Sequence, residues 1–140
     1  MTDVLSKRQR SFNMSRIKSF DTRPEKIVRK FLFSKGLRYR KNDKRYPGHP
    51  DIVLPKYKTV IFVNGCFWHR HKGCRYATTP STNEEFWTNK FKKTIERDIN
   101  EQSILKKMGW KVIVVWECSL RKKSRTKSLE LLYKSILTNN

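Results

Sequence analysis

The chain has 140 residues, with 33 lysines and arginines against 12 aspartates and glutamates, so its formal net charge is +21. This length allows one domain with a real core, and such a charge favours a polyanion as partner, chiefly nucleic acid. No apolar run approaches the roughly 20 residues of a membrane-spanning helix, and the N-terminus lacks the apolar core of a signal peptide, so we expect a cytosolic protein without a membrane partner.

The first 22 residues are polar and basic, and Phe12, Met14 and Ile17 are spaced as in a short helix or an arm that orders on a partner. Neither a repeat nor a Gly/Ser linker interrupts the rest of the chain. We therefore expect a basic segment over residues 1–22 and a single domain over residues 23–140.

Residues 24–35, PEKIVRKFLFSK, predict a helix. Its apolar residues recur at helical spacing, Pro24 suits the first turn, and Gly36 suits the stop. Three strands should follow at residues 37–43, 51–54 and 58–63, because apolar stretches there are separated by the turn sequence YPGHP and by residues 55–58.

Residues 83–108 predict a long amphipathic helix, because apolar residues recur every three to five positions. They are Phe86, Trp87, Phe91, Ile95, Ile99, Ile104 and Leu105. The β-branched run at residues 110–117 predicts a buried strand, and residues 125–138 a closing helix with Leu129, Leu132, Tyr133 and Ile136 inward. This order predicts an α/β (α+β) fold, with a mixed central sheet flanked by helices.

Cysteine and histidine are concentrated in the stretch NGCFWHRHKGC, residues 64–74. Cys66, His71 and Cys74 have the spacing C-x4-H-x2-C, and Cys118 follows the last predicted strand, where the chain could return to the same edge. Three thiolates and an imidazole suit a tetrahedral structural zinc site, whereas the alternative is three unrelated buried cysteines. A site with four protein ligands has no open position for substrate, so zinc would shape the loop.

Aromatic residues adjoin this cluster. Phe67 and Trp68 precede His69, and Trp87 lies at the start of the long helix. All three aromatic residues could be core residues, and His69 a surface histidine. In a basic protein, such aromatics could instead wedge between base pairs, where new stacking and phosphate contacts offset the cost of unstacking.

Asp51 follows Pro50 and opens a predicted strand, and the next strand ends in Phe62, Val63 and Asn64. A Pro-Asp at this place resembles the PD-(D/E)xK arrangement of restriction-type endonucleases, in which carboxylates hold magnesium at a phosphate. The acidic-x-Lys triad is replaced by FVN, so Asp51 would need help from water and from a backbone carbonyl such as that of Val63. Asp51 could instead be a turn residue.

Two other acidic residues, Glu25 and Asp98, also have ordinary structural explanations. Glu25 lies near a helix start, where a carboxylate complements the helix dipole. Asp98 lies in the middle of the long predicted helix, where an exposed charge is the simpler interpretation.

The blocks NMSRI, TRPEK, PGHPDIVL, VIFVNGCFWHRHKGC, EFWTNK, ERD and GWKVIVVWEC resemble those of the very short patch repair (Vsr) DNA mismatch endonucleases in order and spacing, over residues 5 to 122 approximately. The resemblance implies a magnesium-dependent endonuclease of the bacterial cytosol and nucleoid. Such an enzyme nicks one strand of double-stranded DNA beside a thymine–guanine mismatch, and has a restriction-endonuclease-like core and a structural zinc.

The resemblance also implies roles for individual residues. Asp51 would be the direct Mg²⁺ ligand, together with the carbonyl of Val63, and His69 the general base. Glu25 and Asp98 would hold metal-bound water and the histidine. By the same resemblance, Cys66, His71, Cys74 and Cys118 match zinc ligands, Phe67, Trp68 and Trp87 match duplex-opening aromatics, and Met14 and Ile17 match the segment that approaches the opposite groove.

The sequence departs from the family pattern at Asn64, where members often have a second catalytic histidine. An amide can donate a hydrogen bond to a leaving oxygen or orient water, but it supplies no proton near neutral pH. Gly73 adds a residue before Cys74, which a glycine tolerates.

Three hypotheses remain open at this stage. The leading one is a mismatch-nicking endonuclease, for which a monomer suffices and downstream repair proteins are possible partners. The second is a zinc-containing DNA-binding protein with weakened or no activity, and the third a restriction or homing-type nuclease.

Overall fold

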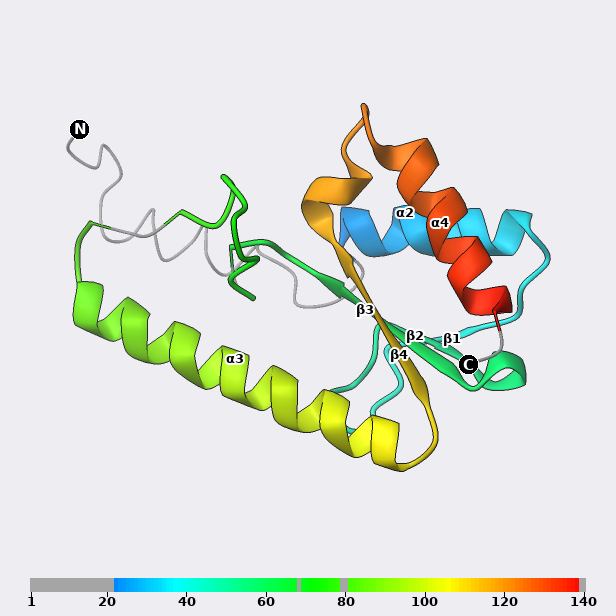
Figure 1. Cartoon of the computed structure of the whole chain (residues 1–140), viewed down its shortest axis with the longest axis horizontal. Coiled ribbons are helices and arrows are strands. Elements are labelled where there is room, and N and C mark those ends of the chain that lie inside the picture. Colours follow the sequence, from blue (N-terminus) through cyan, green and yellow to red (C-terminus); the bar gives the residue numbers. More distant parts are fainter. Residues whose placement is uncertain (1–21, 68, 79–80, 139–140) are drawn as a thin grey trace.

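The computed structural model describes residues 22–67, 69–78 and 81–138. Met14, Ile17 and Trp68, together with almost all of the predicted basic segment 1–22, lie outside these residues. The described elements occur in the predicted order, with a helix, three strands, a long helix, a strand and a final helix. Figure 1 shows a sheet with helices on both faces, so the predicted fold class is confirmed.

Helix α2 (Arg23–Ser34) begins where the sequence predicts it. Thr22 is the N-cap, and its hydroxyl oxygen accepts a hydrogen bond from the Glu25 backbone N–H at 3.5 Å. Pro24 occupies the first turn, and the chain leaves the helix at Gly36, whose φ of 76° suits a residue without a Cβ.

Four strands form one mixed sheet in the order β1 (Arg40–Lys41), β2 (Ile52–Leu54), β3 (Thr59–Asn64) and β4 (Lys111–Trp116). The first three are antiparallel neighbours, and a short 3₁₀ turn, η1 (Pro55–Tyr57), joins β2 to β3. The first strand is shorter than the predicted residues 37–43, because the chain turns away at Asn42 with a φ of 48°.

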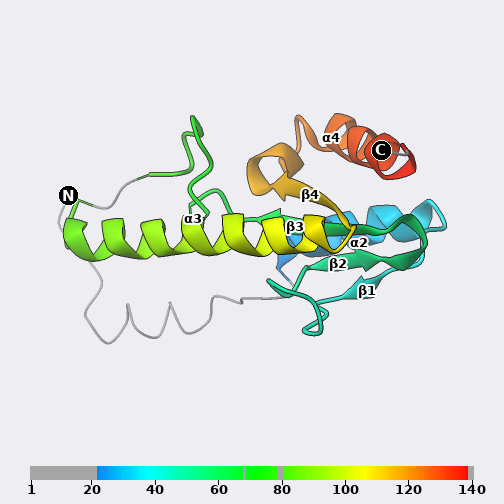
Figure 2. The same cartoon turned by 60° about the horizontal axis from the view of Figure 1, so that its bottom comes forward.

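Helix α3 (Glu84–Lys107) connects β3 to β4, which pair in parallel with Val60 opposite Val112. A parallel pair needs such a crossover because its two strands begin at the same edge. Helix α3 lies along one face of the sheet, and α2 and α4 (Arg125–Leu137) lie on the other (Figure 2). A second 3₁₀ turn, η2 (Glu117–Leu120), leads from β4 towards α4.

The core is divided between these two faces because successive strand residues point in opposite directions. On the side of α2 and α4, Ile52, Leu54 and Ile61 pack against Val28 and Leu132. On the side of α3, the buried residues are Val53, Val60, Phe62 and Leu105. The sheet thus holds the ends of β2 and β3 at a fixed distance from α3.

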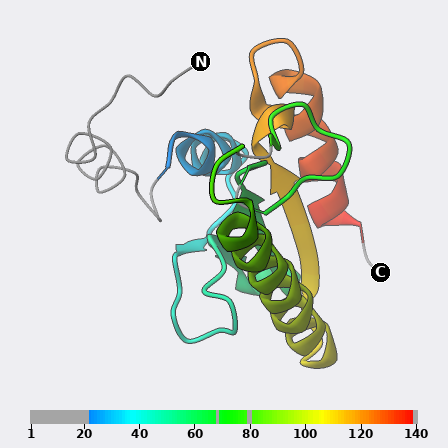
Figure 3. The same cartoon turned by 90° about the vertical axis from the view of Figure 1, so that its left-hand side faces the viewer.

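Two predictions about burial were wrong. Residues 110–117 were expected to form a buried strand, but in β4 (Lys111–Trp116) only Val115 is buried, because β4 lies at an edge of the described sheet. The apolar residues of α3 were expected to face the core, yet Phe86 and Ile99 are 59% and 65% exposed. The N-terminal half of α3, which includes Phe86, extends beyond the sheet (Figures 1 and 2) and has no core to cover, whereas Ile99 lies in the C-terminal half. Figure 3 is turned so that the N-terminal end of α3 faces the viewer.

No helix among the described residues combines the length and the apolar character needed to cross a membrane.

Candidate active site and metal centre

A cleft of about 1230 Å³ opens where the first turn of α2, the ends of β2 and β3, and α3 approach one another. Its wall contains the five residues that the sequence singled out for chemistry: Glu25, Asp51, Asn64, His69 and Asp98. They come from separate parts of the chain, and the fold brings all of them to one place.

Asp51 lies immediately before β2 and is held by the neighbouring strand. The Val63 backbone N–H donates to Oδ2 of Asp51 at 2.6 Å, and the Asp51 carbonyl accepts from the Asn42 N–H at 3.0 Å. These bonds fix the carboxylate beside the end of β3. Burial, together with the negative charge of nearby Glu25, raises the pKa of Asp51 to about 7, although the Val63 hydrogen bond opposes the shift.

Glu25 is 2% exposed, which is exceptional for a carboxylate, and it is anchored on both sides. The Thr22 hydroxyl lies 3.2 Å from Oε1, and the Arg29 guanidinium donates to Oε2 at 3.4 Å. Besides complementing the helix dipole, the position of Glu25 near the start of α2 places a buried carboxylate beside Asp51. Two such groups next to each other, with a raised pKa on Asp51, suit a cation as a third partner.

His69 is paired with Asp98. Its Nδ1 lies 2.6 Å from Oδ2 of Asp98, and the side chains are 26% and 20% exposed. Since an ionised carboxylate only accepts hydrogen bonds, this contact places a proton on Nδ1 and leaves Nε2 to accept one from another group. Asp98 is therefore not simply an exposed charge, the ordinary explanation of its position in the helix, but contacts His69, as the family resemblance implies.

Asn64 is the last residue of β3 and is 5% exposed, opposite Trp116 of β4. Asn64 is among the residues that line the cleft. The cleft therefore contains an amide at this place, which can donate or accept a hydrogen bond.

The structure brings together two of the three predicted duplex-opening aromatics. The rings of Phe67 and Trp87 meet edge to face at 5.8 Å, and Phe91 packs against both. The Arg70 guanidinium lies 4.0 Å from the Phe91 ring centroid and donates to the Phe67 carbonyl. Trp87 and Phe91 lie on the N-terminal half of α3, whereas Phe67 and Arg70 come from the loop that follows β3.

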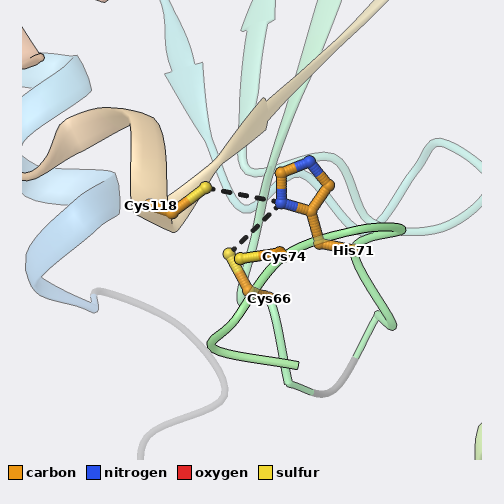
Figure 4. A group of neighbouring side chains, drawn as sticks. All are labelled: Cys66, His71, Cys74 and Cys118. Atoms are coloured by element: carbon orange, nitrogen blue, oxygen red, sulfur yellow. Dashed lines mark hydrogen bonds between the residues drawn. The ribbon is translucent and has the colours of Figure 1, made fainter. Parts of the chain in front are cut away.

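Figure 4 shows that Cys66, His71, Cys74 and Cys118 gather with their sulfur and nitrogen atoms facing one another. The four ligand atoms lie within 4.8 Å of one another, and Nδ1 of His71 is 3.6 Å from Sγ of Cys66 and 3.4 Å from Sγ of Cys118. The sequence prediction that these four residues meet is confirmed.

The sheet explains how residues so far apart in the chain meet. Cys66 follows β3 and Cys118 follows β4, and because these strands are parallel, both chains leave the sheet at the same edge. The His71 ring stacks on Trp116 at 4.2 Å, which fixes its orientation.

The donor set fits a metal ion. Three thiols and one imidazole at this spacing match a tetrahedral site that is closed to substrate. Burial raises the pKa of the Cys66 thiol to about 12, so the group keeps its proton until a cation replaces it, and metal binding would release that proton.

Sequence reasoning missed Glu101 and His49, which also line the cleft. Burial raises the pKa of Glu101, and its Oε2 lies 2.6 Å from the position that a Cβ on Gly48 would occupy. Glu101 follows Asp98 by three residues, so the two share one face of α3. This spacing was the sequence signal that could have identified Glu101 as a cleft residue. His49 has a φ of 46°, for which the turn sequence offered no specific sign.

Comparison with known proteins identifies what this chain is similar to. A family model described as DNA mismatch endonuclease Vsr matches residues 2–75. A type II nicking enzyme, V.NmeAIP of Neisseria meningitidis, is 56% identical over 124 residues, covering 89% of this chain and 88% of that protein. The DNA mismatch endonuclease Vsr of Escherichia coli is 46% identical over 121 residues, covering 86% and 77%. The nicking enzyme V.XorIIP of Xanthomonas oryzae is 45% identical over 120 residues, covering 86% and 88%.

Proposed function

Because this chain belongs to the Vsr family of DNA mismatch endonucleases, which have a restriction-endonuclease-like fold, we propose that it nicks one strand of duplex DNA beside a thymine–guanine mismatch, using Mg²⁺. The observation that carries the proposal is the arrangement of Asp51 and the His69–Asp98 pair in one cleft.

The cation would be bound on the β2–β3 side of the cleft. Asp51, anchored by the Val63 N–H, and the Val63 carbonyl are its proposed ligands, and the buried Glu25 beside them would accept hydrogen bonds from water. Bound there, Mg²⁺ would neutralise negative charge on the scissile phosphate. Mg²⁺ is a hard cation that prefers oxygen ligands and is usually bound by few protein groups. It therefore suits a site with few protein ligands, where substrate oxygens would complete the coordination.

His69 is the proposed general base. As water attacks phosphorus and the bond to the leaving oxygen breaks, Nε2 of His69 takes a proton from that water. Asp98 stabilises the resulting imidazolium and keeps the ring in one orientation. Asn64 would hydrogen-bond the leaving oxygen or the attacking water, and a water molecule would then supply the proton that an amide lacks.

Cys66, His71, Cys74 and Cys118 are the proposed ligands of a structural zinc ion. All four positions would be filled by protein, so this ion would take no part in hydrolysis and would brace the loop that carries Phe67 and His69. Such bracing would hold His69 in position, since His69 lies two residues before the proposed ligand His71.

Phe67 and Trp87, together with Trp68, are the proposed wedge that enters the duplex. A thymine–guanine wobble is already partly destabilised, so opening the stack costs less there than in paired DNA. Met14 and Ile17, in the basic segment 1–22, would contact the opposite groove. The nuclease domain over residues 23–140 would act as a monomer in the bacterial cytosol near the nucleoid, with repair proteins downstream.

Asn64 supports a second candidate, a zinc-containing protein that binds DNA and cleaves it slowly or not at all. A third candidate, a restriction or homing-type nuclease, would use the same cleft on fully paired DNA. The relatives named above include nicking enzymes as well as mismatch endonucleases, so the choice of substrate needs its own test.

A strand-specific nicking assay decides among the three candidates. Wild type, Asp51→Ala and His69→Ala are compared on a thymine–guanine duplex and its paired control, with Mg²⁺ and with EDTA. Mg²⁺-dependent nicking beside the mismatch that both substitutions abolish supports the proposal. Equal nicking of paired DNA supports the third candidate, whereas salt-dependent binding without nicking in Mg²⁺ or Mn²⁺ supports the second.

A further inference from the structure

A second, smaller pocket of about 300 Å³ lies between the first turn of α2, η2 and the start of α4. Four cationic side chains line it: Arg23, Arg121, Lys122 and Arg125. Glu117 is the only acidic residue among its described lining residues, so the pocket carries an excess of positive charge. None of these residues belongs to the proposed nicking machinery.

Two of the guanidinium groups are held in place. Nε of Arg125 donates to the Leu120 carbonyl at 2.8 Å, and Arg121 lies 3.8 Å from the ring centroid of Tyr76. The Tyr76 hydroxyl in turn accepts from Arg75 at 2.7 Å. Cations ordered in this way lose less side-chain entropy on binding than freely moving surface lysines.

The backbone adds to the same electrostatic field. The first turns of α2 and α4 both border the pocket, and the N-terminal end of a helix carries partial positive charge. At the start of α4, the Ser124 hydroxyl donates to the Ser119 carbonyl, 3.0 Å away. The two helix starts and the four side chains all favour a compact anion, and arginine favours phosphate oxygens in particular.

The pocket adjoins the cleft described above. Pro24 and Glu117 line both, so an extended polyanion that occupies the cleft continues across this shared wall towards the cationic side chains. A free phosphate or nucleotide would gain nothing from that continuity, whereas a DNA strand would be bound at both places at once.

We propose that this pocket is a backbone anchor that binds a phosphodiester group of the DNA flanking the nicked position. The proposal rests on the proposed function for its substrate. Contacts to phosphate carry no sequence information, so the pocket strengthens binding to mismatched and paired duplexes alike and fixes how the duplex lies across the cleft.

The test measures DNA binding without added Mg²⁺, which prevents nicking but, unlike EDTA, leaves a bound zinc ion in place, over a range of salt concentrations. The variant Arg121→Gln/Lys122→Gln is compared with Lys127→Gln/Lys134→Gln, which removes the same charge from exposed positions on α4. The first variant should lose about one unit of the slope of log affinity against log salt, and about tenfold in affinity, on both duplexes. The control should keep the wild-type slope. Equal slopes for the two variants would overturn the proposal.

Glu117→Gln provides a test of opposite sign, because it removes a negative charge from the lining of the same pocket. It should tighten binding to both duplexes several-fold, and weaker or unchanged binding would contradict the anchor. Thermal unfolding with millimolar inorganic phosphate identifies a free anion as the occupant. If phosphate stabilises wild type and not Arg121→Gln/Lys122→Gln while the DNA slopes stay equal, the DNA assignment is wrong.

Failure of this proposal is distinguishable from failure of the proposed function. A chain that nicks mismatched DNA but shows equal slopes lacks the anchor and keeps the activity. A chain that shows the expected slope change but never nicks has the anchor and lacks the activity.

Discussion

The Asp98 carboxylate meets the His69 imidazole at 2.6 Å, joining the middle of α3 to the loop that follows β3. Because Nδ1 is hydrogen-bonded to Asp98, Nε2 is the ring nitrogen that can accept a proton. Replacing Asp98 with asparagine keeps the size of the side chain and removes its charge. We expect Asp98→Asn to slow single-turnover nicking by about 10²- to 10⁴-fold while leaving DNA affinity unchanged. A rate within twofold of wild type would show that the pair is only structural.

The raised pKa of Asp51, about 7, makes metal binding depend on pH. A protonated carboxyl competes with the cation, so the Mg²⁺ concentration for half-maximal nicking should rise about tenfold per pH unit below 7 and level off above it. The measurement is a Mg²⁺ titration of nicking at several pH values between 5.5 and 8.5. A half-maximal concentration that stays constant across this range would contradict the expectation.

The same pKa affects the stability of the metal-free protein. The folded state keeps a proton on Asp51 up to a pH of about 7, whereas the unfolded chain releases it near 4. The stability that this group contributes is therefore present below the unfolded pKa and is lost as the pH rises towards 7. In EDTA, Asp51→Asn should remove this loss, which denaturant unfolding of both proteins at pH 4.5 and 7.5 would show.

The thiol and imidazole cluster should carry one zinc ion per chain. Cys118→Ser should lower the zinc content and the thermal midpoint, because it removes one ligand and frees η2 from the loop. His69→Gln is the matched control, since it lies in the same loop but outside the cluster and should retain zinc. Elemental analysis and thermal unfolding give the readouts. Retention of full zinc content by Cys118→Ser would exclude this residue as a ligand.

Gly48 should be sensitive to substitution for two separable reasons. Its φ is 77°, and a Cβ there would lie 2.6 Å from Oε2 of Glu101 and 3.1 Å from the Phe62 ring. Gly36 has nearly the same φ, 76°, with nothing within 4 Å of its Cβ position, so it measures the backbone cost alone. We expect Gly36→Ala to cost about 1 kcal/mol and Gly48→Ala clearly more in denaturant unfolding. Equal costs would show that Glu101 simply moves aside.

Substitutions of Asn64 test how far its amide limits the rate of nicking. Asn64→His places a group that can supply a proton at the same wall of the cleft, and we expect single-turnover nicking to accelerate about tenfold near pH 6.5. Asn64→Ala should nick more slowly than wild type, because it leaves no hydrogen-bond donor there. If Asn64→Ala matches wild type, the amide has no role in the nicking step.

The elements were predictable because their signals are local. Pro24 in the first turn of α2, the stop at Gly36 and the β-branched run at residues 110–117 are each signals carried by neighbouring residues. The burial of β4 was less predictable, since its half-buried residues depend on where the sheet ends. No periodicity carries that information.

The meeting of Cys66, His71, Cys74 and Cys118 could be predicted because these residue types are rare in the chain and their spacing is suggestive. The Asp51–Val63 hydrogen bond and the burial of Glu25 could not, since they depend on how two strands and a helix meet. The cationic pocket could not be predicted for a different reason. In a chain with 33 lysines and arginines, sequence alone does not single out four of them.

Nδ1 of His71 lies 3.4 Å from Sγ of Cys118, a residue 47 positions further along the chain, and this separation spans all of α3. Closing a segment of this length costs considerable chain entropy, and parallel strand pairs of such high contact order form slowly. A complete set of four ligands therefore exists only after β3 and β4 have paired. Zinc uptake should accordingly follow the slowest folding step. The rate of metal incorporation during refolding should therefore report when β3 and β4 pair.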